Sequence, residues 1–138
     1  MFRFSITRSV WNEVCNHCME LLPYEACGLL SGTNGKAETV WVIENVAQSP
    51  VAFEMNMEQV RRALQLIEEK KEELVGMYHS HPTAPPDPSE QDIVHANDLE
   101  LAYLILSFAG KVPVMKGFHI RKKKVIPLSL DVIEDSYK

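Results

Sequence analysis

The strongest constraint on the fold is a proline-rich stretch in the second half of the chain. Residues 82–88 contain four prolines in seven positions, which excludes a helix interior and a central strand there. The apolar run 74–78 before this stretch is typical of a short buried strand, and Ser89 after it is a typical start for a helix. The chain therefore has to leave a strand, form an irregular loop and enter a helix at this point.

The N-terminal part predicts a strand followed by a helix. Residues 2–6 alternate apolar and polar side chains, and Thr7 or Ser9 can cap a helix that runs to about Leu22. The apolar residues of this helix recur at helical spacing and predict one buried stripe: Val10, Trp11, Val14, Cys15, Cys18, Leu21 and Leu22.

The remaining segments predict further strands and helices. Asn34-Gly35 is a strong hairpin signal between two predicted strands. The predicted strands are 26–31, 38–44, 74–78, 101–107, 114–120 and 125–133, and a second helix has apolar positions at Met57, Val60, Ala63, Leu64 and Ile67 before the charged run 68–73. This order predicts an α/β fold, with one mixed β-sheet domain over residues 1–138 that is flanked by helices.

Composition narrows the possible classes of function. With 138 residues, a net charge of -5 and a pI near 5.5, the chain fits one soluble domain and argues against a nucleic-acid partner. The only dense basic run, 121–124, is interpreted as a solvated turn or strand end. No window approaches the roughly 20 apolar residues of a membrane helix, and the N-terminus lacks the apolar region of a signal peptide. Three cysteines fit a reducing compartment, so we expect a cytoplasmic protein.

Two histidines and an aspartate have the spacing of metal ligands. Because the period of a strand is two, His79 and His81 direct both imidazoles to one face. Asp92 lies eleven residues further on, in the first turn of the next predicted helix, where the proline-rich loop can return it to the same point. Two imidazoles and a carboxylate form a three-ligand zinc set with a fourth position open for water. The same set also suits iron or manganese.

Glu25 is the candidate for proton transfer at such a site. A metal lowers the pKa of water from about 16 towards about 7, but a base still has to take and relay the proton. Glu25 precedes the apolar segment 26–31, where a side chain directed to the core would otherwise be apolar. Taken alone, this residue also fits an exposed carboxylate at the start of a strand.

These residues resemble the JAMM motif of MPN+ (JAB-type) metalloproteases. That motif is an upstream glutamate, then His-Ser-His, seven residues, Ser, two residues and Asp. The chain has Glu25, His79, Ser80, His81, Ser89 and Asp92 at this spacing, without departure. The strings PYEACGLL from position 23 and GMYHSHP from position 76 also resemble the small stand-alone prokaryotic members.

The resemblance implies an MPN/JAMM architecture, which is cytidine-deaminase-like, with one zinc ion per chain. His79, His81 and Asp92 would hold the zinc. Glu25 would act as general acid/base and move a proton to the leaving amine, while Ser89 would stabilise the developing oxyanion. Ser89 also fits a helix N-cap that bonds to Asp92, and the two roles are compatible.

Other residues that often carry chemistry have simpler explanations here. Cys15 and Cys18 form a Cys-x-x-Cys pair, but both fall on the predicted apolar stripe and no second ligand pair follows. Cys27 fits a small core residue. His95 lies one helical turn after the predicted aspartate ligand, where a surface or packed position is the simpler reading, and His119 fits a structural role in a strand.

Three classes of function compete. The first is a zinc metalloprotease that hydrolyses peptide or isopeptide bonds at the C-terminal tail of a ubiquitin-like protein. The second is a non-catalytic MPN scaffold, which the complete motif argues against. The third is a zinc deaminase, which needs a His-x-Glu element and a Pro-Cys-x-x-Cys element that the chain lacks.

The resemblance also suggests the partner. We expect a sulfur-carrier or other ubiquitin-like protein whose extended tail ends in Gly-Gly, with removal of protein conjugates as the alternative reaction. The segment that begins at Val46 and ends at Met55 contains Gln48-Ser49-Pro50 and is interpreted as a loop. We expect the tail to bind beside it as an added strand, because small side chains let a backbone approach the metal closely.

Overall fold

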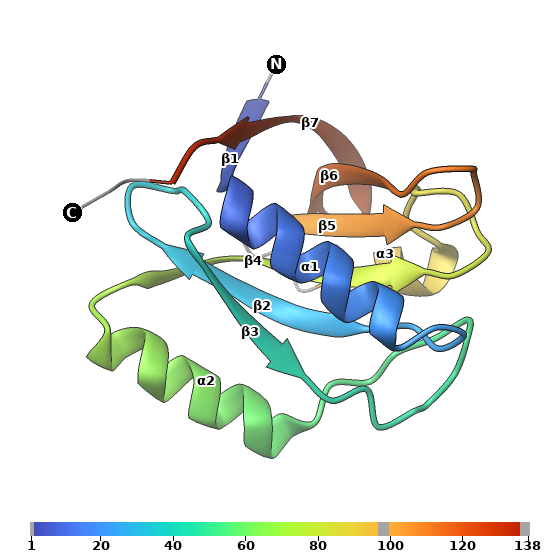
Figure 1. The fold of residues 1–138 in the computed structure, drawn as a ribbon, viewed down its shortest axis with the longest axis horizontal. Helices are drawn as coiled ribbons and strands as arrows, with labels where there is room; N and C mark the ends of the chain where they lie inside the picture. Colours follow the sequence, from blue (N-terminus) through green and yellow to red (C-terminus); the bar gives the residue numbers. More distant parts are fainter. Residues whose placement is uncertain (1, 97–99, 136–138) are drawn as a thin grey trace.

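The architecture is a seven-stranded mixed sheet with helices on both faces, as the sequence predicts. The computed structural model describes residues 2–96 and 100–135 (Figure 1). The strands are β1 (Phe2–Thr7), β2 (Cys27–Gly32), β3 (Thr39–Ile43), β4 (Glu73–His81), β5 (Ala102–Ser107), β6 (Val114–Arg121) and β7 (Lys124–Ile133). The helices are α1 (Arg8–Glu20), α2 (Met57–Glu69) and α3 (Glu90–His95).

The order of strands in the sheet brings distant segments together. It is β1-β7-β6-β5-β4-β2-β3, in which β1 pairs with β7 and β4 with β5 in parallel, while the other pairs are antiparallel. Strands from both ends of the described chain are therefore neighbours at one edge. β4 lies inside the sheet between β5 and β2, and Cys27 of β2 pairs with His79 of β4.

One face of the sheet is covered by α1, which crosses it in Figure 1. Thr7 caps the helix through its side chain, and Val10, Val14 and Cys18 are buried against the sheet, as the apolar stripe predicts. The helix ends at Glu20, before the predicted Leu22, whose side chain is 40% exposed. Because the residue before a proline disfavours the helical conformation, the helix has to end before Leu22.

The opposite face carries α2 and α3 over separate parts of the sheet. Ala63 and Ile67 of α2 are buried, and Ala63 belongs to a cluster with residues of β2 and β3. Met57 and Leu64 were predicted on the apolar side of this helix but are 58% and 41% exposed, because only a narrow stripe of α2 meets the sheet. Ile93 of α3 packs on a third cluster formed by β5 and β6. Within 2–96 and 100–135, no helix is both long and apolar enough to span a membrane.

Two tight turns join antiparallel strands as their sequences predict. Asn34 and Gly35 have φ angles of 54° and 74° and form the centre of a β-turn closed by the bond from the Lys36 N–H to the Thr33 carbonyl, within the connection 33–38 between β2 and β3. Lys122 and Lys123 also have positive φ angles and turn the chain from β6 to β7. The basic run is therefore a turn, which confirms that interpretation.

β4 is longer than the sequence predicts. It was expected to end at Tyr78 but continues through Ser80 to His81, because β2 and β5 pair with it on both sides. The two histidines therefore lie in a buried strand, and its extended backbone directs both side chains to one face, as predicted.

Candidate metal centre

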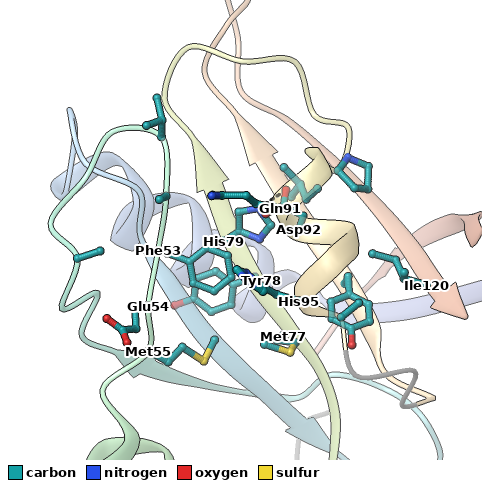
Figure 2. Close-up of a pocket in the computed structure, with 17 residues that line it drawn as sticks. Phe53, Glu54, Met55, Met77, Tyr78, His79, Gln91, Asp92, His95 and Ile120 are labelled. Atoms are coloured by element: carbon teal, nitrogen blue, oxygen red, sulfur yellow. Dashed lines mark hydrogen bonds and ion pairs between the residues drawn. The ribbon is translucent and has the colours of Figure 1, made fainter. Parts of the chain in front are cut away.

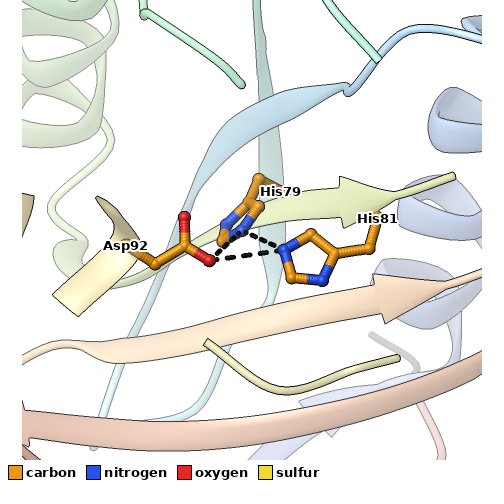
Figure 3. A group of neighbouring side chains, drawn as sticks. All are labelled: His79, His81 and Asp92. Carbon is orange, nitrogen blue, oxygen red and sulfur yellow. Dashed lines mark hydrogen bonds and ion pairs between the residues drawn. The ribbon is translucent and has the colours of Figure 1, made fainter. Parts of the chain in front are cut away.

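His79, His81 and Asp92 converge on one point (Figure 3). The Nε2 atoms of the two imidazoles are 3.1 Å apart, and they lie 3.1 and 3.3 Å from the same Asp92 oxygen, Oδ2. Three atoms that bind one zinc at about 2.0–2.1 Å in tetrahedral geometry lie about 3.3 Å from one another. The spacing of this cluster therefore fits a single metal ion. Among residues 2–96 and 100–135 it is the only group of three such side chains found.

The start of α3 fixes the aspartate. Ser89 caps the helix: its Oγ accepts a hydrogen bond from the Asp92 N–H at 3.1 Å, and its own N–H donates to Asp92 Oδ2 at 2.9 Å. This reciprocal pair is a capping box, as the Ser-x-x-Asp spacing predicts. The same carboxylate oxygen faces both imidazoles, so the cap also holds the third candidate ligand in place.

The proline-rich loop fixes one imidazole. His81 Nδ1 is 2.8 Å from the Pro85 carbonyl oxygen, to which it can only donate its proton. His81 Nε2 then carries the lone pair and is free to bind a metal. The loop itself is held to β5, because the Ser107 hydroxyl donates to the Ala84 carbonyl at 2.6 Å.

The charges of the cluster suit a cation. Burial raises the pKa of Asp92, but the close side chains of His79 and His81 outweigh this and hold the pKa well below its usual range. Burial lowers the pKa of His79, which favours a neutral imidazole. Burial also lowers the pKa of His81, but Asp92 and the Pro85 carbonyl outweigh it, so the net direction is upward. The site therefore has one anionic carboxylate ready to oppose a positive charge.

Glu25 lies beside this cluster. Residues that pair across neighbouring strands share a face, and continuing the pairing of Cys27 with His79 places Glu25 opposite His81. The Glu25 residue is only 4% exposed, and burial raises the pKa of its carboxyl from 4.5 to about 7, with His81 acting to lower it and Asp92 to raise it. The carboxyl can therefore gain or lose a proton near neutral pH.

Ser80 is a contributor that the sequence interpretation missed. It lies between the two histidines and points to the opposite face of the sheet, where its Oγ accepts a hydrogen bond from the Ala26 N–H at 2.8 Å. The Ser80 N–H donates to the Ala26 carbonyl at 3.0 Å. These bonds hold the residue next to Glu25 against β4, so the serine sets the position of the glutamate relative to the cluster.

An apolar cavity of about 360 Å³ opens beside the cluster (Figure 2). Its floor is formed by strands β4, β5 and β6, and its walls by α3 and by residues 46–55, which we call the pocket loop. His79 and Asp92 line the cavity, and the Phe53 ring of the pocket loop stacks on the His79 imidazole with centroids 4.5 Å apart. The cavity therefore reaches two of the three candidate metal ligands.

The other candidate residues take the roles that the sequence predicts. Cys18 and Cys27 are free and buried in core clusters, and Cys15 is free and half-buried. His119 Nδ1 is 3.1 Å from the backbone oxygen of Leu101, which is a structural contact. His95, expected at a surface or packed position, is exposed and also lines the cavity.

His17 was missed as an interacting residue. Its Nδ1 is 2.7 Å from the hydroxyl of the buried Tyr78, on the α1 side of the sheet. The contact joins α1 to β4, the strand that carries His79 and His81. Nothing in the helical spacing marks it, because the partner lies 61 positions away.

A mixed sheet that presents three candidate metal ligands beside a buried glutamate has the groups that metal-dependent hydrolases use. The model of a protein family described as prokaryotic homologs of the JAB domain matches residues 7–120, and the chain belongs to this family. This confirms the predicted membership of the JAMM/MPN group.

Named relatives are enzymes. A desampylase of Pyrococcus furiosus is 37% identical over 87 residues, which cover 63% of this chain and 62% of that protein. A desampylase of Haloferax volcanii is 35% identical over 118 residues, covering 80% of this chain and 84% of the relative. A probable TtuB-protein conjugate cleaving protease of Thermus thermophilus is 33% identical over 106 residues, covering 76% and 70%. The chain thus spans less than two thirds of the Pyrococcus protein and most of the Haloferax protein.

Solved structures share the fold. A solution structure of a protein from Desulfitobacterium hafniense matches with a TM-score of 0.86 and 33% identity, covering 96% of this chain and 94% of that one. The crystal structure of a JAB1/MPN domain protein from Archaeoglobus fulgidus matches with a TM-score of 0.66 and 19% identity, covering 95% and 100%. The second match concerns the fold alone and confirms the MPN architecture.

Proposed function

We propose that this protein is a zinc-dependent peptidase that cleaves at the C-terminal tail of a ubiquitin-like protein. The observation that carries the proposal is the convergence of three ligand atoms at 3.1 to 3.3 Å beside the buried Glu25. The pairing of β1 with β7, from opposite ends of the chain, supports one catalytic domain over residues 1–138.

His79, His81 and Asp92 would hold one zinc ion per chain, and iron or manganese are the alternatives for the same donor set. Their distances support this assignment, as does the contact of His81 Nδ1 with the Pro85 carbonyl, which leaves the Nε2 lone pair of a neutral ring directed at the cluster. A zinc ion at this position would supply Lewis acidity and make a hydroxide nucleophile available near neutral pH.

Glu25 would move the proton. With a pKa of about 7, its carboxylate can accept a proton from the attacking water and deliver it to the nitrogen of the leaving amine. Burial is the cause of the raised pKa, and it also keeps the carboxyl away from competing solvent contacts. Glu25 takes the proton from water and gives it to the leaving amine, so its carboxylate is regenerated after each turnover.

Ser89 would stabilise the negative charge that develops on the scissile carbonyl oxygen. Its Oγ accepts the hydrogen bond of the helix cap from Asp92, so the hydroxyl proton remains available for donation. The cap and the catalytic role are therefore compatible in one side chain.

The pocket loop is the proposed docking site for the substrate tail. Phe53, Glu54 and Met55 line the cavity next to His79, which supports an extended tail lying along this segment. A tail that ends in Gly-Gly would let its backbone approach the metal without a clash of side chains. A substrate complex with the tail away from this loop would reject the docking model.

A sulfur-carrier protein with a Gly-Gly tail is the proposed substrate, and deconjugation of a modifier from a lysine is the second candidate. The names of the relatives, two desampylases and a conjugate cleaving protease, favour testing the second reaction alongside the first. Three free cysteines support a reducing compartment such as the cytoplasm, and the net charge of -5 argues against a nucleic-acid partner.

The test is mass spectrometry of two substrates after incubation with the zinc-loaded protein. One is a ubiquitin-like sulfur carrier extended beyond Gly-Gly, and the other is the same carrier joined to a lysine side chain. Cleavage after Gly-Gly that falls by about 10²- to 10⁴-fold in Glu25→Gln supports the proposal. If both substrates stay intact while zinc is bound, the proposed substrate class is wrong.

A further inference from the structure

A buried amide joins the pocket loop to the backbone of Glu25. Asn45 follows β3 and is only 5% exposed. Its Oδ1 accepts hydrogen bonds from the N–H groups of Ala47 at 3.0 Å and Glu54 at 2.9 Å. Its Nδ2 donates to the carbonyls of Glu25 at 2.9 Å and Ala52 at 3.1 Å. All four hydrogen-bonding positions of the side chain are therefore used.

The pocket loop also holds the other backbone polar group of this glutamate. The Glu25 N–H donates to the Ser49 carbonyl at 2.8 Å. The carbonyl bonded to Asn45 and the N–H bonded to Ser49 thus tie Glu25 to the same segment. The position of its backbone follows the conformation of the pocket loop.

The same segment touches the metal cluster from a second direction. The Phe53 ring stacks on the His79 imidazole at an interplanar angle of 25°. Phe53 lies between Ala52 and Glu54, whose backbone groups are both bonded to Asn45. One side chain therefore organises the stretch that faces the cavity and also holds the backbone of the proposed general base.

We propose that Asn45 is a positioning residue that couples docking of the substrate tail on the pocket loop to the placement of the Glu25 carboxyl. This rests on the proposed function of the site. A substrate tail that pairs with the backbone of the pocket loop would fix the positions of Ala52 and Glu54. Because the Asn45 side chain bonds to both of these residues and to the Glu25 carbonyl, the position of the loop then determines the position of the Glu25 backbone. Misplacement of a reacting group by about 1 Å can cost about 10²-fold in rate, so small movements of the loop are sufficient.

Asn45→Asp keeps the hydrogen bonds that this side chain accepts and removes the hydrogen bonds that it donates. The carboxylate still accepts from Ala47 and Glu54, but it cannot donate to Glu25 and Ala52. The matched control is Asn56→Asp at the other end of the pocket loop, which makes the same change of atoms and charge. Its amide bonds to the side chain of Glu44 and its oxygen caps α2.

The first readout is amide hydrogen exchange of the metal-free protein, measured by NMR. In Asn45→Asp the Glu25 amide should exchange at least about tenfold faster, while the Ala47 and Glu54 amides keep their protection. Asn56→Asp should leave the Glu25 amide unchanged. Unchanged exchange at Glu25 in Asn45→Asp overturns the proposal.

The second readout is the split between kcat and KM with the carrier extended beyond Gly-Gly, at a temperature where each variant is folded and loaded with zinc. Coupling predicts that Asn45→Asp lowers kcat by about 10- to 100-fold and also raises KM. A purely structural role would leave both constants at the wild-type values in the folded protein, and that result overturns the proposal. Asn45→Ser replaces the aspartate variant in both measurements if the latter does not fold.

The two measurements distinguish a failure of the Asn45 proposal from a failure of the proposed function. If the wild-type protein cleaves neither test substrate, the proposed function fails. Exchange at the Glu25 amide still decides whether Asn45 couples the loop to this residue.

Discussion

Replacing Glu25 by glutamine should stabilise the metal-free protein at high pH. Burial raises the pKa of this carboxyl from 4.5 to about 7, so the folded state binds the proton more tightly than the unfolded chain. The stability from this proton is complete below pH 4.5 and is lost as the pH rises through about 7. Since each pKa unit corresponds to about 1.4 kcal/mol, the total is roughly 3 kcal/mol. Glutamine stays neutral and avoids this loss.

The assay is urea denaturation in the presence of a chelator at several pH values. The difference in free energy of unfolding, Glu25→Gln minus wild type, should rise by roughly 3 kcal/mol between about pH 4 and about pH 8. Glu54→Gln is the matched control, because it removes the same charge from an exposed side chain of the pocket loop and should stay within about 0.5 kcal/mol. A flat or falling difference for Glu25→Gln would refute the burial of an ionisable carboxyl at this position.

Three further predictions concern single residues of the fold. Ser80→Ala leaves the buried Ala26 N–H without its acceptor and should lower the free energy of unfolding by about 1–3 kcal/mol in urea; a loss below about 0.5 kcal/mol contradicts this. Gly35→Ala should lower the free energy of unfolding by about 1–2 kcal/mol, because alanine is strained at the φ of 74°. No atom lies within 4 Å of an added Cβ, so a steric clash adds nothing to this cost. An unchanged melting temperature would be inconsistent with the turn. Burial raises the pKa values of the Cys18 and Cys27 thiols to about 12. Neither thiol should therefore react with iodoacetamide at neutral pH in the folded protein, as measured by mass spectrometry. Rapid labelling of either cysteine would show that it is accessible.

The features of the site that depend only on residues close in sequence could be predicted from the sequence. His79 and His81 share a face because the strand period is two, and Ser89 with Asp92 forms a capping box because the spacing fits the first turn of a helix. These features depend on a few neighbouring residues, whose geometry follows from backbone periodicity.

Features that depend on strand pairing could not be predicted in the same way. The burial of Glu25 follows from the antiparallel pairing of β2 with β4, and no local pattern specifies this register. The hydrogen bonds of Asn45 depend on a loop that closes back on itself, and the bond between Ser80 and Ala26 joins positions 54 residues apart. The family motif supplied Glu25 as a candidate, but its raised pKa required the structure.

The most direct test of the central claim is the zinc content of the protein after zinc-replete purification and dialysis, measured by elemental mass spectrometry. The wild-type protein and Glu25→Gln should each hold one zinc per chain, because the glutamate is not a ligand in the proposed site. Asp92→Ala should lose most of the metal, because it removes the only carboxylate of the cluster. A wild-type protein without zinc, or an Asp92→Ala variant that keeps its full zinc content, would contradict a metal centre formed by His79, His81 and Asp92.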